Sequence, residues 1–352
     1  MDLDDLGRFQ KMDRSGLLSQ IDAIPEQLHQ AFQWGSQQSL PAWQPVSQIV
    51  FAGIGLPVLG AELMAVWAQN HCLTPLSVWR NFELPAWAGG PDVLVVICSL
   101  SGEEPVAIAS LTQAVERHCR CLVFTTGGKL ADLAGQAGVP VWVYRHTGPA
   151  MSGMGWFYGL PLSALAKLDV LDHRAGELQE VVSALQRQQA KIRAEVPVVH
   201  NPAKRLAGQL MNRIITIIAA DELAPVARYW KSQLNLISKV WSHFDFVPEA
   251  DETSLAGILN PENDLRRLMV IFLNAASNRP GNLLRLDLTR QSLMLEGIGT
   301  DFYRASGESA ISQQWTAIQF GDYLAYYLAM AYGVDPANLS PIEAFHRSLP
   351  EG

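Results

Sequence analysis

The sequence predicts an α/β protein with two successive parallel sheets, each flanked by helices in a three-layer α/β/α arrangement. Short apolar runs rich in Val, Ile and Leu alternate with longer helix-like stretches along the chain. Strands and helices that alternate in this way form parallel sheets with crossover helices. Glycine-rich connections follow several of the apolar runs, and such turns gather at one edge of a parallel sheet. Because open α/β sheets bind ligands at that edge, it is the predicted site.

Strands are predicted in both halves of the chain. Those of the first half are Gln48–Gly53, Leu76–Arg80, Val93–Ser99, Cys121–Thr125 and Val141–Tyr144, and those of the second are Ile214–Ala220, Phe244–Val247, Leu268–Leu273 and Phe302–Arg304. Helices are predicted at Leu59–Ala68, Pro105–His118, Leu130–Ala137, Ala175–Glu195, Leu223–Val240, Thr253–Leu259, Leu283–Glu296 and Ala310–Tyr332. We therefore expect an N-terminal helical segment over residues 1–45, a first α/β subdomain over 46–170 and a second over 171–352.

The composition excludes several classes of protein. A net charge of −8 leaves no basic surface for nucleic acid. The cysteines include no CxxC pair and no histidine stands at zinc spacing, so we expect reduced thiols and no metal site. The acidic N-terminus has no apolar core, and Tyr323–Tyr332 is too short to span a bilayer. We therefore expect a cytoplasmic protein without a nucleic-acid or membrane partner.

The turn SLSGEE, residues 99–104, carries the clearest sign of a binding site. Its serines and glycine offer hydroxyls and amides of the kind that bind phosphate at the start of a helix. Its two glutamates place carboxylates where a phosphate would sit. Two interpretations stay open: a contact with a ligand, or serines that cap the helix from Pro105 with acids that complement its dipole.

Two further glycine-rich segments lie near the predicted site. The turn at Gly53 and Gly55 does not fit a dinucleotide-binding fingerprint, because the third glycine position is Val58 and the next strand ends at Arg80 instead of an acid. The sequence therefore predicts no bound cofactor. The segment GPAMSGMGWFYG, residues 148–159, is predicted to be a lid or a flexible connection at the mouth of the site.

The order of several motifs resembles the sugar isomerase (SIS) family, and more specifically its bifunctional phosphoglucose/phosphomannose isomerases. The matching segments are FAGIGLPVLGAELM (51–64), VVICSLSGEE (95–104), VFTTGGKLADLA (123–134), NPAKRLA (201–207), KSQLNLISK (231–239), PEADETSLAG (248–257), GDYLAYYLAMAYGVDP (321–336) and IEAFHRSL (342–349). The resemblance implies aldose–ketose isomerisation of hexose 6-phosphates by a homodimer. It also implies that a sugar phosphate or related carbohydrate derivative contacts Gly53, Gly55, Ser99, Ser101, Gly102 and Thr126.

The resemblance also implies that the catalytic positions have changed. The phosphate loop of the family reads Ser-Tyr-Ser-Gly-Asn-Thr, and Glu104 replaces its last hydroxyl. The remaining replacements are Pro57 for a phosphate-binding serine, Leu236 for the carboxylate base, Asp251-Glu252-Thr253 for the ring-opening histidine motif, Ala150 for an arginine and His346 for a lysine. Leu236 cannot take a proton. Glu252 as base and His346 as acid partner are the remaining catalytic candidates.

Three functions therefore stay open. The first is a phosphosugar isomerase of altered specificity or mechanism. The second is a non-catalytic regulator or interaction protein that binds a sugar phosphate or a nucleotide sugar. The third is a structural paralogue whose role is oligomerisation. Loss of the base, the acid, the cation and the guanidinium together favours the second function, because little remains to lower the barrier of the reaction.

Overall fold

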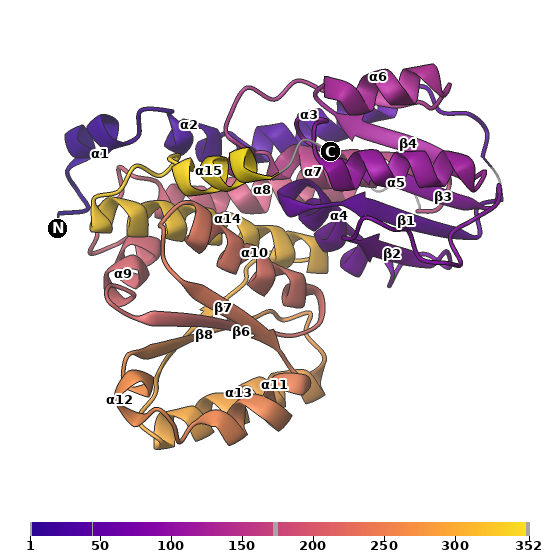
Figure 1. The fold of residues 1–352 in the computed structure, drawn as a ribbon. Helices are drawn as coiled ribbons and strands as arrows, with labels where there is room; N and C mark the ends of the chain where they lie inside the picture. Colours follow the sequence, from indigo (N-terminus) through magenta and orange to yellow (C-terminus); the bar gives the residue numbers. More distant parts are fainter. Residues whose placement is uncertain (1, 44, 172–174, 350–352) are drawn as a thin grey trace. The chain divides into compact units, whose positions relative to one another are not determined.

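The computed structural model describes residues 2–43, 45–171 and 175–349 (Figure 1). The chain divides into two compact units. The first unit is the segment 24–175, and the second unit combines residues 1–23 with residues 176–350. Each unit contains one parallel sheet, so the predicted α/β fold class is confirmed.

The first unit is a five-stranded parallel sheet with helices on both faces. Its strands, β1 (Gln48–Gly53), β2 (Leu76–Trp79), β3 (Val93–Cys98), β4 (Arg120–Thr125) and β5 (Val141–Val143), lie in the order β2-β1-β3-β4-β5. Helix α4 (Gly55–Ala68) lies on one face beside α7 (Met154–Lys167) and α3 (Ile24–Gln37), and α5 (Pro105–Glu116) and α6 (Gly128–Gln136) cover the other. Every side chain of β3 is buried, as expected for a central strand between two helical layers.

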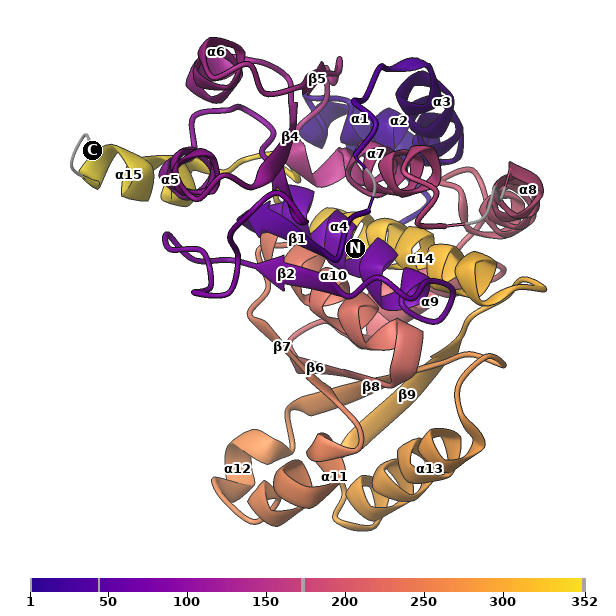
Figure 2. The same cartoon turned by 90° about the vertical axis from the view of Figure 1, so that its right-hand side faces the viewer.

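The second unit is a four-stranded parallel sheet. Its strands, β6 (Ile214–Ala219), β7 (Ser242–Phe246), β8 (Leu268–Asn274) and β9 (Gly299–Arg304), lie in the order β7-β6-β8-β9. Figure 2 shows α9 (Pro202–Gln209), α10 (Ala224–Leu236) and α14 (Ala310–Tyr332) on one side of this sheet, and α11 (Glu249–Thr253), α12 (Glu262–Leu265) and α13 (Pro280–Leu295) on the other. The unit also contains α1 (Leu6–Met12), α2 (Leu17–Asp22), α8 (Ala175–Ile192) and α15 (Ser340–Ser348).

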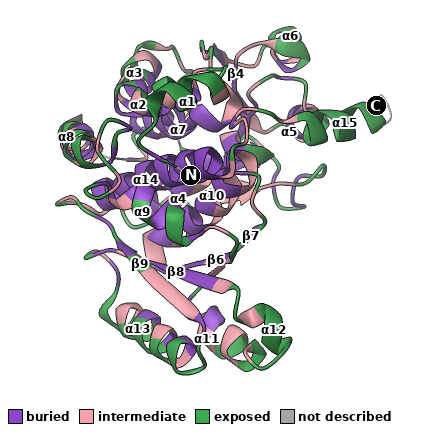
Figure 3. Cartoon of the chain, turned by 90° about the vertical axis from the view of Figure 1, so that its left-hand side faces the viewer, coloured by how far each residue is buried: buried purple, intermediate pink, exposed green. Residues whose placement is uncertain are grey.

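Helix α14 is the most buried element of the second unit (Figure 3). Its side chains are buried without a break from Ile311 to Ala331. The helix begins with a capping box, in which the Ser309 hydroxyl accepts the amide of Ser312 and the Ser312 hydroxyl accepts the amide of Ser309. It ends at Gly333, whose φ of +75° suits the left-handed cap that glycine adopts readily. The predicted helix Ala310–Tyr332 is therefore confirmed, with a physical reason for each end.

The predicted strands all form, whereas the prediction of a loop over residues 148–159 is wrong. A short 3₁₀ turn at Ala150–Ser152 leads directly into α7, which begins at Met154. The glycines of this segment serve helix packing. A Cβ on Gly155 would lie 2.7 Å from the Leu28 amide nitrogen of α3, and one on Gly159 would lie 2.7 Å from the Ala31 Cβ. Their small size lets the two helices approach closely, and no lid is present in this described segment.

The predicted helix Thr253–Leu259 is also displaced in the structure. Helix α11 begins at Glu249 and ends at Thr253, and Ser254–Gly257 forms a 3₁₀ turn. The acids of this segment lie in the first turn of α11, where they complement the helix dipole. In the part of the chain that the structure describes, no helix combines the length and the apolar character needed to cross a bilayer.

Candidate functional site

The carboxyl ends of β1, β3 and β4 meet at one edge of the first sheet, as predicted. A Cβ on Gly53 would lie 2.3 Å from the Cys98 carbonyl oxygen, so only a glycine permits this approach of β1 to β3. Ser99 leaves β3 with its amide bonded to the Phe124 carbonyl at 3.0 Å. The Thr126 hydroxyl donates to the Leu100 carbonyl at 2.7 Å. The structure therefore brings Gly53, Ser99 and Thr126 to this edge. The bond from Thr126 to Leu100 stabilises the SLSGEE turn.

The Glu104 carboxylate is the hydrogen-bond acceptor for both serines of the SLSGEE turn. The Ser99 hydroxyl donates to Glu104 Oε2, and the Ser101 hydroxyl donates to Glu104 Oε1 at 3.0 Å. Each hydroxyl in turn accepts a backbone amide: Ser99 from Gly102 at 2.8 Å and Ser101 from Glu103 at 3.1 Å. The turn thus binds an anion, and the anion is a side chain of the same turn. Of the two open interpretations, capping of α5 by these serines is not what the structure shows: the amides that donate to their hydroxyls belong to Gly102 and Glu103, which precede that helix.

The second glutamate of the turn bonds to the neighbouring helix. Glu103 Oε1 accepts the amide of Lys129, in the first turn of α6, at 3.0 Å. The Gly102 carbonyl accepts the Leu130 amide at 2.9 Å. A Cβ on Gly102 would lie 2.0 Å from the Gly127 carbonyl oxygen, and its φ is +77°. The turn is therefore held against the start of α6, and a carboxylate lies near the amides that would otherwise be free for a phosphate.

The space beside Ser99 is almost filled by apolar and aromatic side chains. The cavity there has a volume of about 10 Å³, and Pro57, Phe124, Tyr144 and Trp156 are among the residues that line it. Such a volume holds about one water molecule. Burial raises the pKa of the Cys98 thiol to about 12, so the cysteine at this edge remains a neutral thiol. This small cavity itself offers no room for a sugar phosphate.

Leu236 lies in a separate, mostly apolar pocket of the second unit. The pocket has a volume of about 260 Å³ and lies at the end of α10, next to the start of α15. Lys239 is the one titratable residue among the described residues that line it. Its Nζ donates to the carbonyls of Leu236 and Pro336, and partial burial lowers the pKa of its ammonium group. The described lining of the pocket therefore contains a cation but no carboxylate to act as a base.

Comparison with known proteins identifies the family. Residues 199–349 match the family described as bacterial phospho-glucose isomerase C-terminal SIS domain. A bifunctional phosphoglucose/phosphomannose isomerase from Caldicellulosiruptor bescii is 26% identical over 332 residues, which cover 93% of this chain and 97% of the relative. Residues 199–349 therefore belong to the SIS-domain family, and the relative is similar over nearly the whole chain. A protein of the same name from Aquifex aeolicus is 23% identical over 335 residues, 94% of this chain and 99% of that relative.

A solved structure supports the SIS fold over the whole chain. The crystal structure of a glucose-6-phosphate isomerase like protein from Thermus thermophilus matches with a TM-score of 0.63 at 19% identity. The match covers 96% of this chain and 98% of that one. The sequence motifs, the two parallel sheets and these similarities therefore agree on a phosphosugar isomerase-like SIS fold.

The structure does not bring the two remaining catalytic candidates of this SIS protein together. Glu252 lies on α11 with 77% of its side chain exposed, and its carboxylate is 4.0 Å from Arg285 Nη1. His346 is an exposed residue of α15, and its ring lies 5.9 Å from that of Phe345. Figures 1 and 2 place α11 and α15 on different sides of the second sheet. A joint acid–base role for the two residues stays a prediction.

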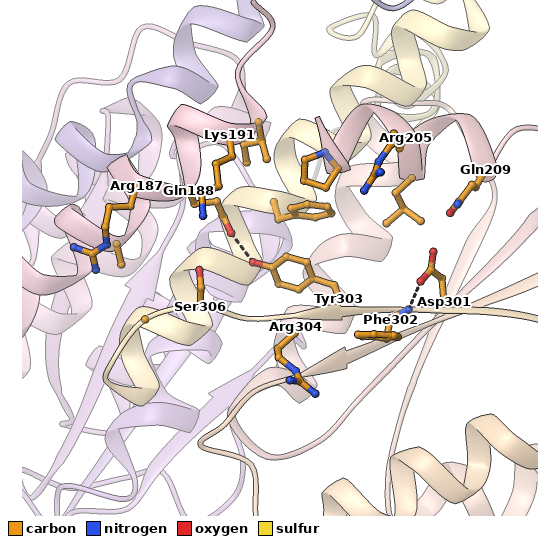
Figure 4. Close-up of a pocket in the computed structure, with 16 residues that line it drawn as sticks. Arg187, Gln188, Lys191, Arg205, Gln209, Asp301, Phe302, Tyr303, Arg304 and Ser306 are labelled. Atoms are coloured by element: carbon orange, nitrogen blue, oxygen red, sulfur yellow. Dashed lines mark hydrogen bonds between the residues drawn. The ribbon is translucent and has the colours of Figure 1, made fainter. Parts of the chain in front are cut away.

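Sequence reasoning missed a cationic pocket in the second unit (Figure 4). This pocket, which we call the β9 pocket, has a volume of about 630 Å³. The cations that line it come from the consecutive helices α8 and α9 and from β9, which follows them about 90 residues later in the sequence. Ala175–Glu195 is predicted only as a polar connector helix, although Arg187 and Lys191 stand one helical turn apart on it. That spacing is the one local signal that places two cations on the same helix face.

Proposed function

We propose that this SIS protein is a non-catalytic relative of the phosphosugar isomerases, with the Glu104 carboxylate bound in its phosphate loop in place of a substrate phosphate. The observation that carries the proposal is the pair of hydrogen bonds from Ser99 and Ser101 to Glu104. A phosphate that approached these hydroxyls would have to displace the carboxylate and would be repelled by its charge.

The chemistry of the isomerase reaction supports the same proposal. Moving a proton between two carbons needs a positioned base, and the developing enediolate needs a stabilising cation. Leu236 supplies neither at the position that the resemblance assigns to the base. Lys239 is nearby, but its Nζ is already bonded to two backbone carbonyls. A cation without a base does not complete the reaction.

An isomerase assay tests this proposal. Purified protein is given glucose 6-phosphate or mannose 6-phosphate, and formation of fructose 6-phosphate is followed with a coupled enzyme. We expect no turnover above that of a Ser99→Ala/Ser101→Ala variant prepared in the same way. Turnover by the natural protein that this variant lacks would show a working phosphate loop and would refute the proposal.

Ligand binding by the turn is the second part of the proposal. The relatives are named for phosphoglucose and phosphomannose, so a sugar phosphate or related carbohydrate derivative is the first ligand to test. We propose that Glu104 weakens binding of the phosphorylated forms and that Gly53, Gly55, Gly102 and Thr126 shape the turn. We also propose a homodimer, as the family resemblance implies, and light scattering of the purified protein measures its mass directly.

A further inference from the structure

A further cavity of the second unit lies at the amino end of its sheet, where β6 and β8 begin. It has a volume of about 430 Å³, and its lining includes Arg213, Lys239, Arg267 and Tyr332. Cavities of roughly 300–1,000 Å³ are the usual size of small-molecule sites. The described residues that line it include three cations and no carboxylate. We call it the strand-entry pocket.

The two arginines of the strand-entry pocket lie side by side. Ile214 of β6 pairs with Leu268 of β8, and the Ile214 amide donates to the Arg267 carbonyl at 2.9 Å. Arg213 and Arg267, the residues just before this pair, are therefore neighbours at the start of two adjacent strands. Leu268 packs against the core on the α13 side of the sheet, so the residue before it faces the other side, toward α10 and α14. Like charges on adjacent strands repel each other, and a bound anion would relieve that repulsion.

Neither arginine is neutralised by an acid in the described part of the chain. Both side chains are exposed. Arg213 Nη1 donates to the Arg266 carbonyl at 3.0 Å, and the Arg267 side chain has no hydrogen bond or ion pair among the same residues. The neighbouring Arg266, by contrast, is paired with Glu262 at 2.8 Å. Most of the N–H donors of Arg213 and Arg267 are therefore available to a ligand.

Lys239 and Tyr332 add two further donors at fixed positions. The Lys239 ammonium donates to the carbonyls of Leu236 and Pro336, which leaves one of its three N–H groups for a ligand. The Tyr332 hydroxyl accepts the amide of Asn212 at 2.7 Å and has no acceptor of its own among the described residues. Lys239 and Asn212 also have φ values of +59° and +60°, in the left-handed region that residues other than glycine occupy rarely. Backbone strain of this kind gathers at binding sites, where the surrounding structure holds it in place.

We propose that the strand-entry pocket binds the phosphoryl group of a small phosphate monoester. Arginine donates to phosphate oxygens in a fixed fork geometry, and the three cations match the charge of about −2 on a phosphomonoester. A carboxylate carries a single charge and would leave the arginines only partly neutralised. The volume of about 430 Å³ leaves room for a substituent beside the phosphoryl group. The site is independent of the SLSGEE turn, which lies in the first unit.

The test is calorimetric titration of the full chain with glycerol 3-phosphate, inorganic phosphate, acetate and uncharged glycerol. We expect glycerol 3-phosphate to bind most tightly, inorganic phosphate to bind less tightly, and acetate and glycerol not to bind. Affinity should fall as salt is raised, because phosphate contacts are screened. An Arg213→Gln/Arg267→Gln variant should weaken binding of glycerol 3-phosphate by about tenfold or more, the scale of lost charged hydrogen bonds.

The matched control is Arg266→Gln/Arg279→Gln, which removes the same charge from exposed arginines of the same unit that do not line the pocket. It should bind like the natural protein. Equal weakening by both double variants would show only general attraction and overturn the site. Equal binding of inorganic phosphate and glycerol 3-phosphate would overturn the assignment to a monoester.

A variant of the first unit separates this site from the SLSGEE turn. Ser99→Ala/Ser101→Ala should bind glycerol 3-phosphate like the natural protein, because neither serine lines the strand-entry pocket. Loss of binding in this variant would place the phosphoryl group at the turn and overturn the proposal. No heat from glycerol 3-phosphate at millimolar concentration overturns the proposal entirely.

Discussion

The SLSGEE turn of the first unit and the β9 pocket of the second unit both present groups that bind anions, but only the turn supplies its own anion. In the turn, two hydroxyls bond to Glu104, and the neighbouring cavity holds about 10 Å³. In the β9 pocket, Lys191 and Arg205 have no acid partner among the described residues, and about 630 Å³ is open. A family motif therefore does not by itself show where the open site of the protein lies.

The largest expected effect on stability is at Gly102 in the SLSGEE turn. This prediction tests whether the turn is as rigid as its contacts imply. Gly102→Ala places a Cβ against the Gly127 carbonyl at a φ of +77°, where side chains are strained. We expect the free energy of unfolding to fall by about 2–4 kcal/mol. Urea denaturation measures this change.

The matched control for that variant is Gly135→Ala in α6, where an added Cβ meets no neighbouring atom among the described residues. Alanine is the better helix former, so this variant should be more stable by about 0.5–1 kcal/mol. Similar effects of the two substitutions would mean that the SLSGEE turn adapts freely, and the comparison with the open β9 pocket would lose its basis.

The next effect concerns a carboxylate that is buried for structural reasons. Asp322 Oδ1 accepts hydrogen bonds from the Tyr229 hydroxyl and from Gln233 Nε2, both at 2.6 Å. Burial raises the pKa of Asp322 from 3.8 to about 7. The folded protein therefore holds a proton that the unfolded chain has lost, and this contribution to stability is present below pH 3.8 and is lost as the pH rises to about 7.

The measurement is the free energy of unfolding at pH 5 and pH 8 for the natural protein and for Asp322→Asn. The natural protein should lose about 2–3 kcal/mol relative to the variant over this range, from the linkage of about 1.4 kcal/mol per pKa unit. Parallel pH profiles for the two proteins would mean that Asp322 ionises normally. In that case burial in this fold would not by itself keep a carboxyl group protonated.

The smallest expected effect is at the exposed candidate base. Glu252→Gln removes a carboxylate that is 77% exposed and weakly paired with Arg285. We expect a change in stability below about 0.5 kcal/mol, as for most surface substitutions. If the protein proves to have isomerase activity, its loss in this variant alone would restore Glu252 as the base. Unchanged activity would remove that hypothesis.

The sequence predicted the sheets well because their strands are continuous runs of buried β-branched and apolar residues. The run VLVVIC of β3 has no alternation and no breaker, so it could only be a central strand. Glycines misled the prediction at residues 148–159, because the same residue type serves flexible loops and close helix packing. Gly155 and Gly159 leave room for α3 to pack closely against α7. A single sequence does not reveal this contact.

The candidate site was predictable only in part. The motif order located the turn at Ser99–Glu104, and the family resemblance places Leu236 where the base is expected. The direction in which Glu104 points was not predictable, since an acid at a helix start complements the dipole whether or not it turns back to the serines. The β9 pocket was missed because Lys191 and Arg205 line the same cavity only through the fold.

The most direct measurement is calorimetric titration of glucose 6-phosphate into the natural protein, Glu104→Thr and the control Glu116→Thr. Threonine restores the hydroxyl that the family resemblance places at position 104, and Glu116 is an exposed acid outside the turn. We expect Glu104→Thr to bind glucose 6-phosphate about tenfold more tightly than the natural protein, a gain of about 1.4 kcal/mol, and Glu116→Thr to show no gain. Equal affinities for all three proteins, or weaker binding by Glu104→Thr, would contradict the central claim that Glu104 takes the place of the phosphate.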